Sequence, residues 1–335
     1  MFGSPRRSLL AAAPLVLVLA LAACGAPGSS APGGAGGTAA TATSKGCAPT
    51  PGDALVVLAD DKKLQTVDNV VPAVNAQAAT PPLLAALDKV SAALTTSQLI
   101  AMNKSVDLDR KTSPDVARQY VDQQGLATGL SGGSGKVVVG AANFGENQTL
   151  ANIYALVLRA AGFDATVQTI GNRELYEPAL ESGQIQVVPE YAGTLTEFLN
   201  KKVNGPGAAP QASGDLTATM SALTGLAQRV GLVVGKPAQA ADQNAFAVTK
   251  AFADRYQLRT LSDLAAKCNG GPLVLGGPPE CAQRPFCQPG LQQTYGLAFT
   301  GFQALDAGGP LTKTAVKQGR VQLGLVFSSD GSLAG

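Results

Sequence analysis

The pattern of apolar and polar residues changes from a strand period to a helix period at residue 80. The run ALVVLADD at 54–61 is apolar, β-branched and closed by charge, which predicts a short buried strand. DNVVPAVNA at 68–76 predicts a second extended segment, because Pro72 disfavours helical backbone at the residue before it. Apolar residues at helical spacing then predict helices over 80–93, 96–107 and 113–125, the third of them capped by Ser113.

The second half of the chain alternates strand and helix patterns after a glycine-serine spacer, GLSGGSGK at 129–136. Residues 136–170 predict a strand, a turn, a long helix and a strand, which form a βαβ unit, and residues 173–193 repeat the alternation. An extended stretch at 236–250 and a helix pair at 252–267 continue it. The rhythm predicts an α/β fold with parallel strands joined by crossover helices.

Length and composition narrow the class of protein. A chain of 335 residues is long enough for two lobes with separate cores. Its net charge of +2 and its 14% of charged residues provide no dense basic face, so nucleic acid is not an expected partner. The sequence has no histidine, which removes Ser-His-Asp and Cys-His catalysis and histidine zinc sites. We therefore expect no enzyme activity, no cofactor and no metal.

The N-terminus has the layout of a bacterial export signal. Two arginines precede an apolar run that ends in LAAC, so residues 1–23 are predicted to be a signal peptide. The small residues before Cys24 resemble a lipobox, which implies a lipid on Cys24 and a place on the extracytoplasmic face of the cell membrane. A transmembrane anchor is the alternative, but the apolar run is short for a span of about 20 residues. Residues 24–52 are predicted to be a disordered tether because they are of low complexity.

The other cysteines are expected to form disulfides, because an exported protein meets an oxidising compartment. Cys281 and Cys287 enclose a short loop that can close on itself. Cys47 and Cys268 can pair with each other, and the sequence leaves that connectivity open. Zinc is the less favoured alternative, because a CxxxxxC pair without histidine lacks the usual ligand spacing.

Three segments of the second half of the chain resemble one family of transport proteins. They read GAANFGENQTLANIYALVLRAAGF, GNRELYEPALESGQIQVVPEYAGT and LGGPPECAQRPFCQPGLQQTYGLAF, in that order. They are similar to the substrate-binding proteins of ABC importers for glycine betaine, choline, carnitine and related quaternary-ammonium osmoprotectants. The resemblance implies a two-lobed α/β periplasmic-binding-protein fold of type II, with the ligand held between the lobes.

The order of the segments predicts a circular permutation of that family. Residues 136–335 resemble the family's N-terminal part, whereas residues 54–127 resemble its C-terminal part, so residues 128–135 would link the old termini. The alternative is a coincidental helical segment ahead of a truncated binding protein. The resemblance assigns residues 64–242, linker included, to lobe 1, and residues 54–63 and 243–335 to lobe 2.

The family holds the methylated ammonium group in an aromatic cage, and the resemblance carries several cage positions over to this chain. Tyr191 in PEYAGT matches a cage tyrosine, and Phe246 in QNAFAV and Phe327 in LVFSSDG fall at other aromatic positions. Thr194 matches a hydroxyl at the polar end of the ligand, and Arg284 in CAQRPFC matches an arginine that pairs with a ligand carboxylate. Each phenylalanine is also a plausible core residue.

Two positions depart from the family pattern. Asp68 stands where a fourth cage tyrosine is expected, and Ala142 replaces a polar residue in the turn after the first strand. This exchange predicts a preference for a net cation over a zwitterion. Asn143, ahead of a helix, is a further candidate ligand contact, because a helix N-terminus presents N–H groups to an anion.

The resemblance implies an extracytoplasmic solute-binding component that delivers a small quaternary-ammonium ligand to an ABC permease and its ATPase. One alternative is a ligand-sensing or scaffold lipoprotein with the same fold, and another is a binder of a different small polar solute, such as an amino acid. A catalytic pair formed by Asp242 and Glu190 is disfavoured, because no tuning partner or sugar-binding cleft accompanies it.

Overall fold

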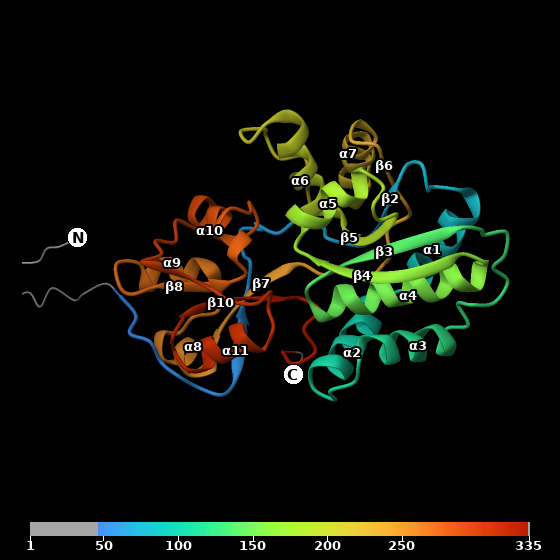
Figure 1. The fold of residues 1–335 in the computed structure, drawn as a ribbon. Coiled ribbons are helices and arrows are strands. Elements are labelled where there is room, and N and C mark those ends of the chain that lie inside the picture. Colours follow the sequence, from blue (N-terminus) through green and yellow to red (C-terminus); the bar gives the residue numbers. More distant parts are fainter. Residues whose placement is uncertain (1–45, 334–335) are drawn as a thin grey trace, which may run out of the picture. The chain divides into compact units, whose positions relative to one another are not determined.

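The computed structural model describes residues 46–333, and it divides them between two β-sheets that belong to one compact unit. Each sheet and its helices form a lobe (Figure 1). The elements of lobe 1 are β2 (Val70–Asn75), α1 (Pro81–Ala93), α2 (Thr96–Asp107), α3 (Ser113–Gln123), β3 (Lys136–Ala142), α4 (Gly145–Ala161), β4 (Asp164–Gly171), α5 (Arg173–Glu181), β5 (Val187–Tyr191), α6 (Ala192–Asn204), α7 (Leu216–Arg229) and β6 (Leu232–Val234). The elements of lobe 2 are β1 (Leu55–Leu58), β7 (Asn244–Thr249), α8 (Lys250–Tyr256), α9 (Leu261–Cys268), β8 (Val274–Gly277), η1 (Pro279–Ala282), α10 (Gln288–Tyr295), β9 (Gly301–Ala304), α11 (Pro310–Lys317) and β10 (Leu323–Phe327).

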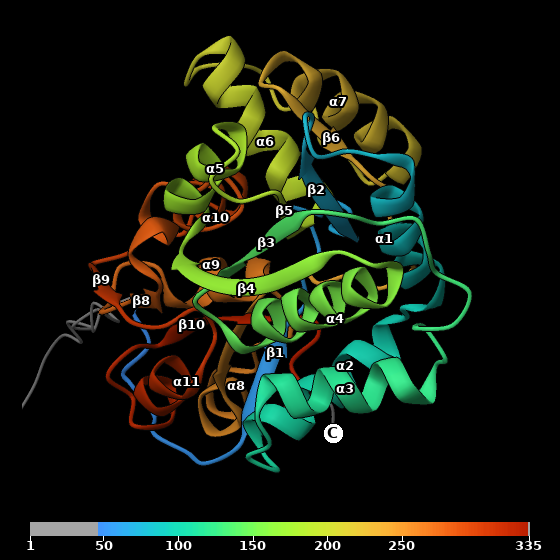
Figure 2. The same cartoon turned by 45° about the vertical axis from the view of Figure 1, so that its right-hand side comes forward.

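The sheet of lobe 1 has the strand order β4-β3-β5-β2-β6 and is covered on both faces. In β2, Val70 and Val74 join the core formed with α1 to α4, whereas Val71 and Ala73 join the core formed with α5 to α7. Figures 1 and 2 show these two groups of helices on opposite sides of the sheet. Both faces of β2 are buried, which explains why its sequence is almost continuously apolar.

The helices of lobe 1 begin at polar caps. Thr95 and Gln98 form a capping box at the start of α2. At α3 the cap is Thr112, whose side chain accepts a hydrogen bond from the Asp115 N–H, and Ser113 is already the first helical residue. The predicted cap was therefore one residue late.

The sheet of lobe 2 has the strand order β1-β7-β10-β8-β9. Its strand β7 lies between β1 and β10, so Phe246 faces Leu58 on one side and Leu325 on the other. These three side chains belong to one core that α8, α9 and α10 cover. The two-lobed α/β architecture that the sequence predicts is confirmed, but both sheets are mixed, since β7 pairs antiparallel with β1 and β10 and β2 pairs antiparallel with β5 and β6.

The chain passes between the lobes in segments 59–69 and 235–243, which contain the boundaries predicted at residues 64 and 242. The two segments lie side by side, because Asn69 and Ala241 form an isolated antiparallel bridge. The turn after β10 joins them, since the Ser328 N–H donates to the carbonyl oxygen of Gln243 at 2.9 Å. Three backbone segments thus meet at the junction of the lobes.

The N-terminal part of the described chain packs on lobe 2. A disulfide joins Cys47 to Cys268 across a sequence separation of 221 residues, and the Cys47 side chain is buried. The Gly52 N–H donates to the carbonyl oxygen of Lys317 at 2.9 Å. Residues 46–52, which the sequence analysis assigned to the tether, therefore pack on lobe 2. The predicted signal peptide and Cys24 lie outside the described residues.

The glycine-serine spacer follows a defined path against lobe 1. Gly129, Gly132 and Gly135 have φ angles of 68°, 83° and 84°, in the left-handed region that glycine adopts without strain. The Gly133 N–H donates to the carbonyl oxygen of Ala161 at 2.8 Å, where a side chain on Gly133 would collide with the Phe163 ring. The spacer therefore connects α3 to β3 with residues that suit its turns.

Within residues 46–333, none of the helices has the length and apolarity that a membrane span requires.

Candidate ligand-binding site

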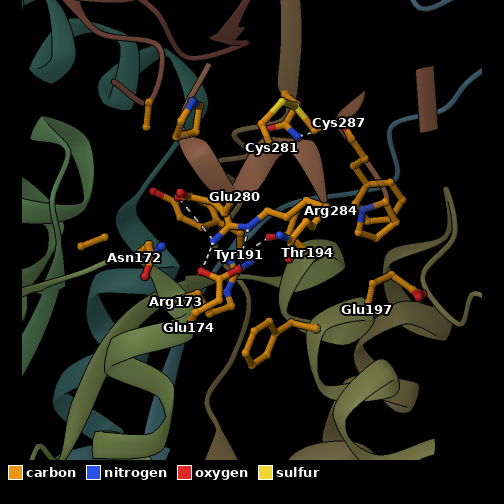
Figure 3. Close-up of a pocket in the computed structure, with 18 of the residues that line it drawn as sticks. Asn172, Arg173, Glu174, Tyr191, Thr194, Glu197, Glu280, Cys281, Arg284 and Cys287 are labelled. Atoms are coloured by element: carbon orange, nitrogen blue, oxygen red, sulfur yellow. Dashed lines mark hydrogen bonds and ion pairs between the residues drawn. A yellow bond between two sulfur atoms is a disulfide. The ribbon is translucent and has the colours of Figure 1, made fainter. Parts of the chain in front are cut away.

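A cavity of about 480 Å³ lies between the two lobes, within the size range of small-molecule sites. Figure 3 shows a close-up of its walls. Lobe 1 and the segment that leads into it contribute Asp68, Asn143, Phe144, Arg173, Glu174, Tyr191 and Thr194. Lobe 2 contributes Asn244, Arg284, Phe327 and the disulfide-bonded Cys281 and Cys287, among others.

Three aromatic rings form one wall of the cavity, and we call Phe144, Tyr191 and Phe327 the aromatic wall. Phe144 stacks on Tyr191 with ring centroids 6.3 Å apart and on Phe327 with centroids 5.6 Å apart. Phe144 follows β3, Tyr191 ends β5 and Phe327 ends β10, so all three lie at the carboxyl ends of strands. The wall presents apolar, electron-rich faces of the kind that attract an ammonium group.

A buried carboxyl pair supports the aromatic wall from behind. Glu146 accepts hydrogen bonds from the Tyr191 hydroxyl at 2.7 Å and from the Ser329 hydroxyl at 2.6 Å. Asp242 accepts from the Ser329 N–H at 3.1 Å. Burial raises the pKa of Glu146, and burial together with the charge of Glu146 raises the pKa of Asp242 well above its usual range. Both carboxyls therefore keep their protons to a higher pH than solvent-exposed carboxyls do.

Arg173, one of the basic residues that line the cavity, is held in an internal ion pair. Arg173 donates to both carboxylate oxygens of Glu190, at 2.8 and 2.6 Å, and also to the Thr194 hydroxyl at 2.9 Å. Tyr176 donates to Glu190 as well, at 2.8 Å. Arg173 and Glu190 are both buried, so their charges balance each other within the protein.

Asp68 combines a structural contact with a place on the cavity. One of its oxygens, Oδ1, accepts from the N–H groups of Gly193 and Thr194, at 2.9 and 3.0 Å, in the first turn of α6. A side chain on Gly193 would collide with Thr66 and Val67, so only glycine lets the helix come this close. Burial raises the pKa of Asp68 to about 7, although the Thr194 N–H and the charge of Arg173 lower it.

Arg284 bridges the two lobes. Its guanidinium donates to both oxygens of Glu174 in lobe 1, at 3.2 and 2.9 Å, and lies 3.7 Å from Glu280 in its own lobe. Figure 3 shows Arg284 and Glu174 together at the cavity, near the Cys281–Cys287 disulfide. The arginine predicted to pair with a ligand carboxylate is thus already engaged by protein carboxylates.

The structure brings most of the predicted site residues together. Tyr191, Thr194, Asp68, Asn143, Arg284 and Phe327 line the cavity. Phe246 does not: it is 1% exposed and lies in the core of lobe 2. The prediction that Phe246 forms part of a cage is therefore wrong, because the strand runs from the cavity into the lobe and Asn244, at its start, is the residue that reaches the cavity.

Several lining residues were not predicted, chiefly Phe144, Arg173, Glu174 and Asn244. Phe144 had a usable signal, because it follows a parallel strand and precedes a helix, the place where ligand sites form in α/β proteins. Glu174 had none, since its contact with Arg284 joins residues 110 positions apart. In the described part of the chain, no three His, Cys, Asp or Glu side chains are grouped as around a metal ion.

Two α/β lobes joined by crossing segments, with a cavity lined from both, define a two-lobed solute-binding protein. The chain belongs to the family described as the substrate binding domain of ABC-type glycine betaine transport systems, whose profile matches residues 50–123 and 135–335. The family and the binding-protein fold predicted from the sequence are thereby confirmed. It is a family of solute-binding proteins, not of enzymes.

Individual relatives match the chain in part. The glycine-betaine-binding protein of Pseudomonas aeruginosa is 31% identical over 207 residues, and the match covers 58% of this chain and 62% of that protein. The chain therefore spans less than two thirds of the length of that relative. A solved structure of a glycine betaine/carnitine/choline ABC transporter is 22% identical with a TM-score of 0.38, covering 59% of this chain and 71% of its own.

Proposed function

We propose that this protein is the extracytoplasmic solute-binding component of an ABC importer and that it captures a quaternary-ammonium compound between its lobes. The observation that carries the proposal is the aromatic wall at the interlobe cavity of a chain from this family. A methylated ammonium group has no N–H to donate, so ordinary hydrogen bonding cannot hold it. Aromatic faces attract it instead, by about 0.5–2 kcal/mol per contact.

The relatives support the choice of ligand. The family is described by glycine betaine transport, and the relative from Pseudomonas aeruginosa is a glycine-betaine-binding protein. We propose that the ligand of this chain comes from the same chemical group, that the captured ligand passes to a membrane permease driven by an ATPase, and that a lipid on Cys24 holds the protein at the membrane.

The test is titration calorimetry on the purified full chain with choline, glycine betaine, carnitine and proline. We expect micromolar binding of at least one methylated ammonium compound and no comparable binding of proline. Tyr191→Ala and Phe327→Leu should each weaken binding by about tenfold or more, since each removes an aromatic face. Tyr191→Phe keeps the ring and should retain most of the affinity.

Two outcomes of this titration would contradict the proposal. A folded chain that binds none of the methylated compounds would exclude the quaternary-ammonium ligand. Equal affinity for proline and choline, unaffected by Phe327→Leu, would show that the aromatic wall is not the recognition element.

We also propose that the chain is a circular permutant of its family. Two observations support this. The family match is interrupted between residues 123 and 135, where the glycine-serine spacer lies. Gly52 contacts the end of α11 through Lys317, whereas Ser332 contacts the side chain of Lys313 in the middle of the same helix. The eight-residue helix α11 is only about 12 Å long, so Ser332 and Gly52 lie close enough for a short connection. In the family's order, that connection would lead from Ser332 into Gly52.

A further inference from the structure

The cavity is poor in free positive charge. Three of its basic side chains are already paired: Arg173 with Glu190 at 2.6 Å, Lys202 with Glu177 at 2.6 Å and Arg284 with Glu174 at 2.9 Å. In the described residues, Lys201 is the lining basic residue without a carboxylate partner. It lies seven residues along α6 from Thr194, about 10 Å further along the helix axis than the end at Asp68.

A carboxyl group, that of Asp68, lines the inner end of the cavity, where α6 begins. Asp68 Oδ1 accepts from the first turn of α6, but no hydrogen bond or ion pair within residues 46–333 reaches Asp68 Oδ2. The side chain is 5% exposed and lines the cavity. A buried carboxylate with one free oxygen is a strong hydrogen-bond acceptor, and it repels another anion placed beside it.

The groups around Asp68 do not neutralise it. The charge of Arg173 of α5 lowers the pKa of Asp68, but the guanidinium of Arg173 is held by Glu190 of β5 and by Thr194 of α6. Asp242 of the second crossing segment adds a further acid, and its N–H donates to the Asp68 carbonyl oxygen at 3.0 Å. A ligand that brings its own positive charge would therefore supply the missing counter-ion.

We propose that Asp68 makes this site selective for ligands with a net positive charge, such as choline, over zwitterions of the same ammonium group, such as glycine betaine. The inference rests on the proposed function and narrows its ligand class. A zwitterion would have to place its carboxylate in a cavity whose near basic groups are all engaged and whose inner end is acidic. Selectivity then comes from repulsion of the wrong ligand as well as attraction of the right one.

The same geometry couples binding to pH. Burial raises the pKa of Asp68 to about 7, so the empty site is protonated in acid and ionised in base. A cation binds the ionised form better, which makes binding release a proton near neutral pH. Affinity for choline should therefore fall as the pH drops below about 7, by up to about tenfold per pH unit.

The experiment is titration calorimetry on the full chain with choline and glycine betaine at pH 6, 7 and 8. We expect choline to bind at least about tenfold more tightly than glycine betaine at pH 8, with its affinity falling toward pH 6. Titrations at pH 7 in buffers of different ionisation enthalpy should show proton release with choline. Asp68→Asn keeps an oxygen that accepts from α6, and it should lose this release and bring the two affinities toward each other.

A matched control is Asp215→Asn, which alters an aspartate that caps α7 through the Ala218 N–H away from the cavity. It should leave both affinities and the pH dependence unchanged. Equal affinities, or tighter binding of glycine betaine, by the unaltered protein would overturn the inference while the proposed function stands. Binding of neither compound would overturn the proposed function and this inference with it. Selectivity and proton release are measured on the unaltered protein, so the test does not depend on whether a variant folds.

Discussion

At the scale of single residues, the unusual feature is the set of carboxyl groups buried at the junction of the lobes. Asp68, Glu146 and Asp242 are each at most 7% exposed, and their pKa values are raised, in each case chiefly by burial. Hydrogen bonds from Tyr191 and Ser329 satisfy Glu146, which lets the protein keep these groups in its interior. Their protonation is linked to folding.

The sign of this linkage predicts how stability depends on pH. A carboxyl whose pKa is higher in the folded state binds its proton more tightly there, so its stabilisation is complete below the unfolded pKa and is lost as the pH rises through the folded pKa. For Asp68 the pKa rises from 3.8 to about 7, which corresponds to about 4 kcal/mol. The ligand-free protein should therefore lose stability from pH 5 to pH 8.

Guanidinium unfolding of the full chain at pH 5, 6.5 and 8 measures this loss. Asp242→Asn keeps the oxygen that accepts from the Ser329 N–H. The substitution should reduce the change of the unfolding free energy with pH, because the neutral amide does not ionise. An unfolding free energy that rises over this pH range would contradict the buried, protonated carboxyls.

At the scale of elements, local patterns predicted most of the helices and strands. Apolar residues at helical spacing located α1, and the alternation of strand and helix patterns after the spacer located the β3-α4-β4 unit. Local patterns could not show whether a residue lies at the cavity end of its strand or further along, in the core of the lobe. Phe246 has the aromatic character of a site residue, but its register opposite Leu58 and Leu325 places it in a core.

Contacts between elements explain the rest of the difference between prediction and structure. Arg284 was predicted to meet a ligand carboxylate, and the structure shows that it lines the cavity and pairs with Glu174 of α5, a partner that only the arrangement of the lobes reveals. Asp68 was identified because it departs from a family motif, but its role at the first turn of α6 depends on the close approach of Gly193. The sequence therefore identified Arg284 and Asp68 as site residues but did not reveal the groups that they contact.

At the scale of the whole molecule, the order of segments along the chain and their arrangement in space are separate questions. The family match covers both sides of the spacer, and the spacer packs on lobe 1 through the Gly133 N–H and the Asp164 N–H, which donates to the carbonyl oxygen of Gly135 at 2.9 Å. A disulfide from Cys47 to Cys268 fastens the N-terminal part of the described chain to lobe 2.

A reordered chain tests the proposed permutation. In it, residues 136–333 would precede residues 52–127, with a short glycine-serine connection from Leu333 back to Gly52. Because the contacts of the lobes other than the Cys47–Cys268 disulfide are retained, we expect the reordered chain to fold, to melt within a few degrees of an original-order chain that lacks the same disulfide, and to bind the same ligand. A reordered chain that stays unfolded, while the original folds under the same conditions, would contradict the permutation.

The most direct test of the proposed function is a crystal structure of the full chain with choline. We predict that the quaternary nitrogen lies in the interlobe cavity, within about 6 Å of the ring centroids of Tyr191 and Phe327, the range of a cation–π contact. Choline found elsewhere, or in the cavity with its nitrogen turned away from these rings, would contradict the account.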